Sequence, residues 1–217
     1  MTVSCSKNKA IKIWDAIDYT KTMSLPGNKA LFSPSGNKII TIHSAFTATL
    51  WNAQTLQALT TEKPLILQGH TNRINSAVFN SAEDKVLTIS KDKTALLWNA
   101  LTGTVLVTFK GHEKTIISGA FNDSEDQIVT TSKDHTAKIW DAKKGTLLVT
   151  LGIASTLKDM NLYFFTWALF NKTDDHLITL STRRTLELWD ISSVKQIELD
   201  KAEFLNKGTK ELDCCLQ

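Results

Sequence analysis

Hydrophobic and polar residues alternate along the chain in short runs that recur at regular intervals. Each run holds a few residues rich in Val, Ile, Leu, Thr and Ala, and a polar turn follows it. Alternation with a period of two is typical of β-strands, whereas no segment sustains the 3.6-residue period of a helix. The pattern therefore predicts an all-β protein built from many short strands.

Five tryptophans each end a strand-like run and divide the chain into repeats. The runs AIKIW, TATLW, TALLW, TAKIW and TLELW end at Trp14, Trp51, Trp98, Trp140 and Trp189. Each full repeat has room for four antiparallel strands. In the repeat that ends at residue 151 we expect them near residues 115–122, 127–132, 136–141 and 146–151. A four-stranded sheet cannot cover both of its faces alone, so we expect the sheets to pack side by side.

The clearest repeat occurs twice, at residues 69–109 and 111–151. The two copies align without a gap at an offset of 111 − 69 = 42, and 21 of 41 aligned residues are identical. Each copy begins with Gly-His and carries Trp-Asn or Trp-Asp near its end. In period and in these residues the chain resembles the WD40 repeat family. The resemblance implies an all-β, WD40-type β-propeller with about five four-stranded blades.

We expect residues 1–217 to form a single WD40 repeat domain. The repeats are placed at residues 1–26 (partial), 27–68, 69–110, 111–152 and 153–200, followed by a C-terminal segment at 201–217. Because residues 4–15 match residues 88–99, the first repeat lacks its inner strand. Residues 210–217 are one candidate for that strand, which would close a five-bladed ring. The alternative is a partial arc of a larger propeller.

The second and fifth repeats depart from the pattern. In the second, Asn28 replaces the His and Ala45 stands at the Asp position. In the fifth there is no Gly-His, and Arg183 stands at the Asp position. The fifth repeat also has seven extra residues between Thr150 and Ala168, which form a longer, aromatic-rich loop. The resemblance is therefore specific for the third and fourth repeats and weakest for the second.

Four polar or aromatic positions are shared by the two best repeats. They are His70, Ser90, Asp92 and Trp98 in one copy, and His112, Ser132, Asp134 and Trp140 in the other. The resemblance implies a structural relay in which the buried indole N–H donates to Ser, and Ser and His lead on to Asp. Breaking such a network strands its remaining members at a cost of roughly 1–3 kcal/mol.

The same Ser, His and Asp residues also raise the question of a hydrolase. The trio recurs in two tandem repeats, each time with Trp at fixed spacing, which is typical of a scaffold. Neither segment has the Gly-rich elbow that would expose a nucleophile beside an oxyanion hole. We therefore expect no catalytic residues and no enzymatic activity.

Composition narrows the functional classes further. Lys and Arg exceed Asp and Glu by 25 − 22 = 3, which is too balanced for a dedicated nucleic-acid or membrane-surface protein. No apolar run reaches the length of a membrane span, and no secretory signal follows Met1. Cys5, Cys214 and Cys215 form neither a disulfide framework nor a metal-ligand spacing. We expect a cytoplasmic protein with no cofactor and no metal site.

One face of the expected propeller is predicted to be basic. By the resemblance, this face carries the Gly-His loops and the Asp turns, and WD40 proteins often bind partners there. Its candidate partner-binding residues are Arg73, Lys91, Lys114, Lys133, Arg183 and Arg184, with Phe164 as an aromatic anchor. These cations predict an acidic or phosphorylated peptide as the ligand. A solvated charged surface without a partner is the alternative interpretation.

The sequence therefore predicts a non-catalytic WD40 scaffold that mediates protein–protein interaction. One alternative is a propeller enzyme with its site in the central channel. Carboxylates or histidines at the starts of the inner strands would favour it, but Asn72, Arg73, Lys114 and Thr115 stand there. The other alternative is a nucleic-acid binder that uses the basic face, which steep salt dependence of duplex binding would favour.

Overall fold

The fold is a succession of small antiparallel sheets. The computed structural model describes residues 2–5, 10–14, 22–53, 65–152, 164–192 and 195–197. All the regular elements in these ranges are strands, which confirms the expected all-β class. No helix in these ranges is long and apolar enough to cross a membrane.

The strands form one three-stranded and four four-stranded sheets, and each sheet is a continuous stretch of chain. The first sheet contains β1 (Thr2–Cys5), β2 (Ala10–Trp14) and β3 (Thr22–Pro26). The second contains β4 (Lys29–Phe32), β5 (Lys38–Ile42), β6 (Thr47–Asn52) and β7 (Leu65–Gln68). The third contains β8 (Ile74–Phe79), β9 (Lys85–Ser90), β10 (Thr94–Asn99) and β11 (Val105–Lys110).

The last two sheets have the same order of strands. The fourth contains β12 (Ile116–Phe121), β13 (Gln127–Ser132), β14 (Thr136–Asp141) and β15 (Leu147–Gly152). The fifth contains β16 (Phe165–Phe170), β17 (His176–Ser181), β18 (Leu186–Asp190) and β19 (Lys195–Ile197). Each sheet is a meander in which consecutive strands pair, as expected for strands joined by short polar turns.

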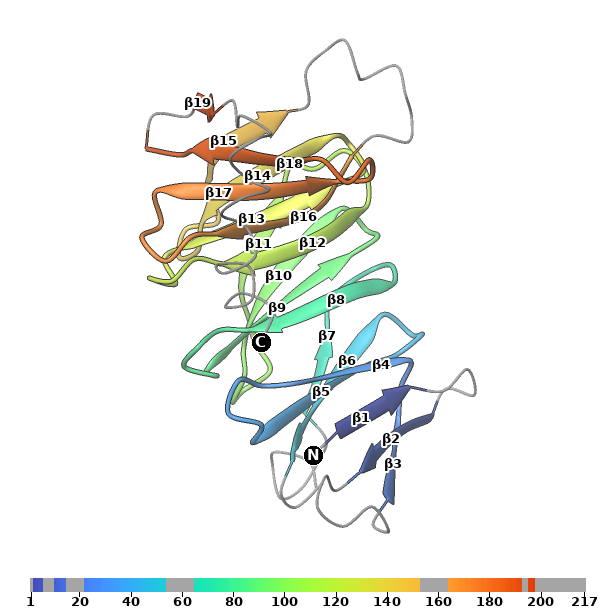
Figure 1. Cartoon of the computed structure of the whole chain (residues 1–217). Coiled ribbons are helices and arrows are strands. Elements are labelled where there is room, and N and C mark those ends of the chain that lie inside the picture. Colours follow the sequence, from blue (N-terminus) through green and yellow to red (C-terminus); the bar gives the residue numbers. More distant parts are fainter. Residues whose placement is uncertain are drawn as a thin grey trace.

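The five sheets follow one another in chain order, with the first and the fifth at opposite ends of the row (Figure 1). The arrangement is therefore an arc of sheets over the described residues. Residues 210–217, the candidate closing strand, lie outside the described residues. The same holds for residues 153–163 of the aromatic-rich loop.

The hydrophobic core lies between adjacent sheets. We call the side of a sheet that contacts the next sheet its forward face, and the other side its backward face. The forward face of the third sheet is formed by Leu87, Ile89, Ala95 and Leu97, which pack on Ile116, Ile128 and Trp140 of the fourth sheet. Since burying one such side chain contributes roughly 1.5–3 kcal/mol, these sheet-to-sheet contacts carry most of the stability.

Candidate functional site

Each tryptophan on the third strand of a sheet is tied to a threonine on the second. Trp98 is 1% exposed, and its partner in the β9–β10 register is Val86. Thr88 stands two residues further along β9, so its side chain lies on the same face of the sheet. The indole Nε1–H of Trp98 donates to Thr88 Oγ1 over 2.7 Å. This bond satisfies a donor that would otherwise be buried without a partner.

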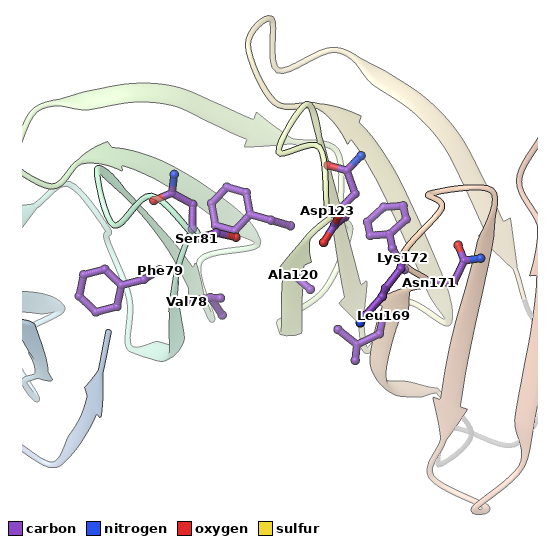
Figure 2. Close-up of a pocket in the computed structure, with 12 residues that line it drawn as sticks. Val78, Phe79, Ser81, Ala120, Asp123, Leu169, Asn171 and Lys172 are labelled. Atoms are coloured by element: carbon purple, nitrogen blue, oxygen red, sulfur yellow. The ribbon is translucent and has the colours of Figure 1, made fainter. Parts of the chain in front are cut away.

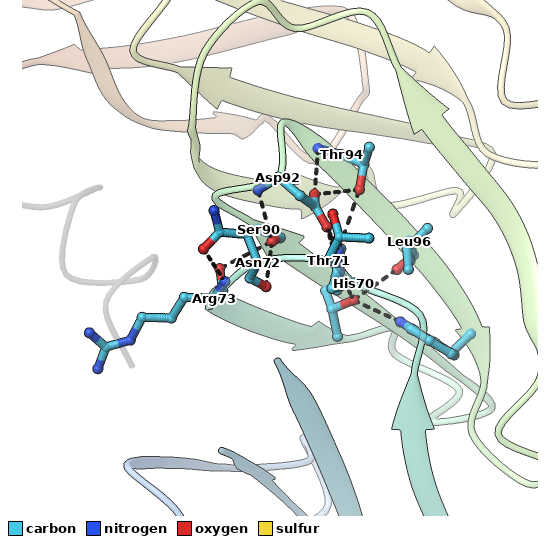
Figure 3. A network of polar contacts seen from close by, with 10 residues as sticks. His70, Thr71, Asn72, Arg73, Ser90, Asp92, Thr94 and Leu96 are labelled. Atoms are coloured by element: carbon cyan, nitrogen blue, oxygen red, sulfur yellow. Dashed lines mark hydrogen bonds and ion pairs between the residues drawn. The ribbon is translucent and has the colours of Figure 1, made fainter. Parts of the chain in front are cut away.

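His70 and Asp92 extend this bond into a chain of hydrogen bonds that ends in the turn after β9 (Figure 3). His70 Nε2 lies 2.8 Å from Thr88 Oγ1, and His70 Nδ1 lies 2.7 Å from Asp92 Oδ2. One arrangement of hydrogens satisfies every atom. The indole donates to Thr88, the Thr88 hydroxyl donates to His70 Nε2, and Nδ1–H of a neutral His70 donates to Asp92.

The environment of the His–Asp pair favours a neutral imidazole beside an ionised carboxylate. Burial lowers the pKa of His70, and this outweighs the opposing attraction of Asp92. Burial alone would raise the pKa of Asp92, but hydrogen bonds from Thr94 and from the Thr71 N–H lower it. Asp92 therefore stays charged. Its carboxylate accepts a hydrogen bond from the backbone N–H of Thr71, the residue after His70.

The fourth sheet repeats this network with nearly the same dimensions. Trp140 Nε1 donates to Thr130 Oγ1 over 2.8 Å, and His112 Nε2 lies 2.8 Å from the same hydroxyl. His112 Nδ1 lies 2.7 Å from Asp134 Oδ2. Burial opposes the charge on Asp134, but hydrogen bonds from His112 and Thr136 place its pKa far below the usual range.

The prediction that Ser90 and Ser132 connect the indole to the imidazole is wrong, because Thr88 and Thr130 occupy that place. The Ser90 hydroxyl instead donates to the Asn72 carbonyl over 3.0 Å and accepts from the Asp92 N–H over 3.1 Å. Ser90 ends β9, about 6.6 Å beyond Thr88 along the strand, and it therefore shapes the turn.

A sequence signal for the correct residue exists. A hydroxyl residue stands ten positions before each of the five repeat tryptophans. These residues are Ser4, Thr41, Thr88, Thr130 and Thr179.

The second and fifth sheets keep the tryptophan–threonine bond. Trp51 Nε1 donates to Thr41 Oγ1 over 2.9 Å, and Trp189 Nε1 donates to Thr179 Oγ1 over 3.0 Å. In the second sheet, Nε2 of His43, the residue after β5, lies 3.2 Å from Thr41 Oγ1. The second repeat lacks the Gly-His sequence, and His43 lies beside the threonine hydroxyl instead.

The Ser, His and Asp residues do not form a hydrolytic arrangement. Ser90 is fully buried, and its hydroxyl is engaged with backbone groups. A nucleophile needs an accessible hydroxyl that a base can deprotonate. Among the described residues, no group of three or more His, Cys, Asp or Glu side chains is arranged to hold a metal ion.

The predicted cations lie along one edge of the row of sheets. This edge, called the basic edge here, contains the turns between second and third strands and the residues just before first strands. Backbone bonds bring members of the two groups together, because the Lys91 N–H donates to the Arg73 carbonyl over 2.9 Å. All six cations predicted for this edge are exposed in the structure. They are Arg73, Lys91, Lys114, Lys133, Arg183 and Arg184.

Phe164 links the fourth and fifth sheets at the basic edge. Lys133 Nζ lies 5.7 Å from the centre of the Phe164 ring, within range of a cation–π contact. Phe164 is half-buried, and its carbonyl accepts from the Thr182 N–H over 3.0 Å. The structure therefore brings Lys133, Phe164 and the turn that carries Arg183 to one place.

Two exposed residues of the basic edge, Lys93 and Phe46, are not among the residues predicted from the sequence. Lys93 and Phe46 occupy the same turn position in the third and second sheets, five residues before the tryptophan. Both have positive φ angles, of 71° and 63°, and Phe46 is 40% exposed. Counting back from each tryptophan would have found them, because His135 and Arg184 share the position.

An open groove of about 270 Å³ lies at the opposite edge, where the first strands of three sheets end (Figure 2). Its apolar wall includes Val78, Ala120 and Leu169, and Asp123 and Lys172 stand at its polar rim. The groove lies at the end of the first strands away from the basic edge, so it is a separate surface.

The comparisons with known proteins agree with this geometry. Residues 61–99 and 103–141 match the family model described as WD domain, G-beta repeat. No curated protein matches the chain. Each matched segment includes the fourth strand of one sheet, β7 or β11, and the first three strands of the next. One sequence repeat therefore spans two sheets, which explains why His70 follows β7 but bonds into the third sheet.

Proposed function

This chain contains WD40 repeats, and on that premise we propose that it binds an acidic or phosphorylated peptide segment along its basic edge. WD40 repeats in general indicate a protein-interaction scaffold, and such domains are generally non-catalytic. The site on this chain is formed by the turns of the third, fourth and fifth sheets. Its ligand contacts are Arg73, Lys91, Lys114, Lys133, Arg183 and Arg184, with Phe164 beside them.

The observation that carries the proposal is the excess of positive charge on one rigid edge. Among the described residues of this edge, the exposed acidic residue beside these cations is Glu113, since Asp92 and Asp134 are turned inward toward His70 and His112. The turns are held by Ser90, Ser132 and the two aspartates, so their backbone is ordered before a ligand arrives. Preorganised cations bind carboxylates and phosphates with a smaller entropic cost.

Lys133 and Phe164 give the edge its most specific feature. The ring restrains the ammonium group at the junction of the fourth and fifth sheets. A ligand with a negative group next to an apolar side chain would contact both residues. We therefore expect an acidic residue or phosphate followed by an apolar residue to bind better than a run of acidic residues.

The test is a charge reversal on the basic edge with a matched control. The variant combines Lys91→Glu, Lys133→Glu and Arg183→Glu. The control combines Lys143→Glu, Lys144→Glu and Lys172→Glu, which changes the net charge equally at exposed positions of the opposite edge. Binding to arrays of acidic and phosphorylated peptides is then measured by fluorescence anisotropy of the best sequences.

We expect the basic-edge variant to lose affinity by at least about tenfold and the control to keep most of it. Equal losses in the two variants would mean that net charge alone attracts the peptide, and would contradict the proposal. A random DNA duplex serves as a second ligand. If it binds more tightly than the peptides, with steep salt dependence, the basic edge is a nucleic-acid surface.

A further inference from the structure

The forward face of the fifth sheet is apolar and half-exposed, whereas the same face in the third and fourth sheets is buried. In the fourth sheet Val129 and Ile139 are 0% and 1% exposed, because Phe165, Leu177 and Trp189 of the fifth sheet cover them. The equivalent positions in the fifth sheet are Ile178, Leu180, Leu186 and Leu188, and all four are half-buried.

A second feature of the sheet-to-sheet interfaces is a carboxylate that reaches back to the preceding sheet. It comes from the turn between the first and second strands and accepts hydrogen bonds from backbone N–H groups of the preceding turn. Glu83 accepts from Ser35 (2.5 Å), Glu125 from Ser81 and Ala82 (2.7 and 3.3 Å), and Asp174 from Asp123 and Ser124 (2.9 and 3.0 Å). We call this contact the carboxylate clasp.

The clasp residues occupy a backbone conformation that favours glycine. Glu83, Glu125 and Asp174 have φ angles of 56°, 58° and 57°, and the same position in the second sheet is Gly36 with φ of 74°. A non-glycine residue there costs conformational free energy. The bonds to the preceding turn offset that cost, so the acidic side chain at this position is part of the interface.

The fifth sheet carries the donor half of a clasp. Its turn places the N–H groups of Lys172 and Thr173 where Ser81 and Ala82 stand in the third sheet, and where Asp123 and Ser124 stand in the fourth. Figure 2 shows Ser81, Asp123 and Lys172 at the corresponding turns of the three sheets. Within the described part of the chain, the N–H groups of Lys172 and Thr173 donate to no carboxylate.

We propose that the forward face of the fifth sheet, with the Lys172 and Thr173 N–H groups, is a docking surface for a four-stranded sheet of a partner protein. The partner sheet would bury Ile178, Leu180 and Leu188 under its backward face, the face that carries the tryptophan. It would also carry Asp or Glu in the turn after its first strand, to complete a carboxylate clasp. This interaction is independent of the basic edge, because it uses the end of the row of sheets.

The experiment supplies such a sheet from this chain's own sequence. A second copy of residues 111–152, which carries Glu125, Thr130 and Trp140, is appended after Gln217 of the full chain. Cys5, Cys214 and Cys215 are changed to Ser, and Leu188→Cys reports on the forward face. The rate of maleimide labelling is measured at a concentration low enough to exclude contacts between molecules. Separate Val105→Cys and Leu97→Cys variants provide the exposed and buried reference rates, since these side chains are 42% and 2% exposed.

We expect the appended sheet to slow labelling of Leu188→Cys by at least about tenfold and to leave Val105→Cys unchanged. Changing Glu125→Gln only in the appended copy should raise the labelling rate of Leu188→Cys about threefold, because the clasp is lost while the apolar contact remains. Equal labelling with and without the appended sheet would overturn the proposal. So would equal protection by the Gln copy, or an unextended chain in which Leu188→Cys is already as slow as Leu97→Cys.

Discussion

The third and fourth sheets contain the full Trp–Thr–His–Asp network, whereas the second and fifth keep its tryptophan–threonine core without the His–Asp pair. The indole donates to a threonine in all four sheets, over 2.7 to 3.0 Å. Trp98 and Trp140 are each 1% exposed, Trp189 is 6% exposed, and Trp51 is half-buried. The two kinds of sheet therefore share one fold and differ in how deeply the tryptophan is buried.

The difference separates two physical roles. Apolar sheet faces and the indole–threonine bond are common to all four sheets, so they are sufficient to build one. The His–Asp pair adds a tie between the segment after one sheet's fourth strand and the turn of the next sheet, as between His70 and Asp92. This tie holds the turns that carry Lys91 and Lys133. The network therefore positions the proposed binding surface as well as stabilising the core.

The largest expected effect that distinguishes the two kinds of sheet comes from Asp134→Ala. Asp134 accepts from His112 Nδ1, from the Glu113 and Thr136 N–H groups and from the Thr136 hydroxyl. Losing these partners should cost about 1–3 kcal/mol in free energy of unfolding. The melting temperature should fall by roughly 2–12 °C for a chain of this size.

Arg183→Ala is the matched control, because Arg183 occupies the same position in the fifth sheet and is exposed. Its effect should stay within about 0.5 kcal/mol in chemical denaturation. Similar losses in the two variants would show that the His–Asp pair does not distinguish the sheets.

A smaller effect of opposite sign is expected from Thr131→Val. Thr131 is fully buried on the forward face of the fourth sheet, and its hydroxyl has no hydrogen-bond partner among the described residues. The same position holds Ile42, Ile89 and Leu180 in the second, third and fifth sheets. The valine variant should be more stable by about 1 kcal/mol in urea denaturation, because a desolvated hydroxyl is replaced by a methyl group. A loss of stability would mean that the hydroxyl has a partner.

The smallest effect is the pH dependence that His70 contributes. Burial places its folded-state pKa below the ordinary value of 6.5, so the unfolded state binds the proton more readily. The stability of the wild-type protein should therefore fall as the pH falls from 7 to 5. His70→Gln should make the free energy of unfolding depend less on pH. The change in slope should be smaller than the roughly 1.4 kcal/mol per pH unit that one fully bound proton provides. An unchanged slope, measured by urea denaturation at each pH, would contradict the assignment of a neutral buried His70.

The repeating pattern made the strands and most of the network predictable. Tryptophan, Gly-His and Ser-Lys-Asp recur at fixed spacing, and each spacing corresponds to an element of the structure. Thr88 and Thr130 were missed because the choice between Thr88 and Ser90 depends on the register of β9 against β10. The carboxylate clasp was also missed, since Glu125 meets Ser81 from another sheet and only the packing of the two sheets brings them together.

The central claim is that threonine, and not the serine of the turn, receives the indole hydrogen in the second to fifth sheets. The most direct measurement is the ¹⁵N–¹H spectrum of the tryptophan indole groups in Thr130→Val and Ser132→Ala variants. We predict that Thr130→Val shifts the Trp140 Nε1–H resonance and speeds its exchange with solvent, while Ser132→Ala leaves it in place. A Trp140 resonance that responds to Ser132→Ala and ignores Thr130→Val would contradict the account.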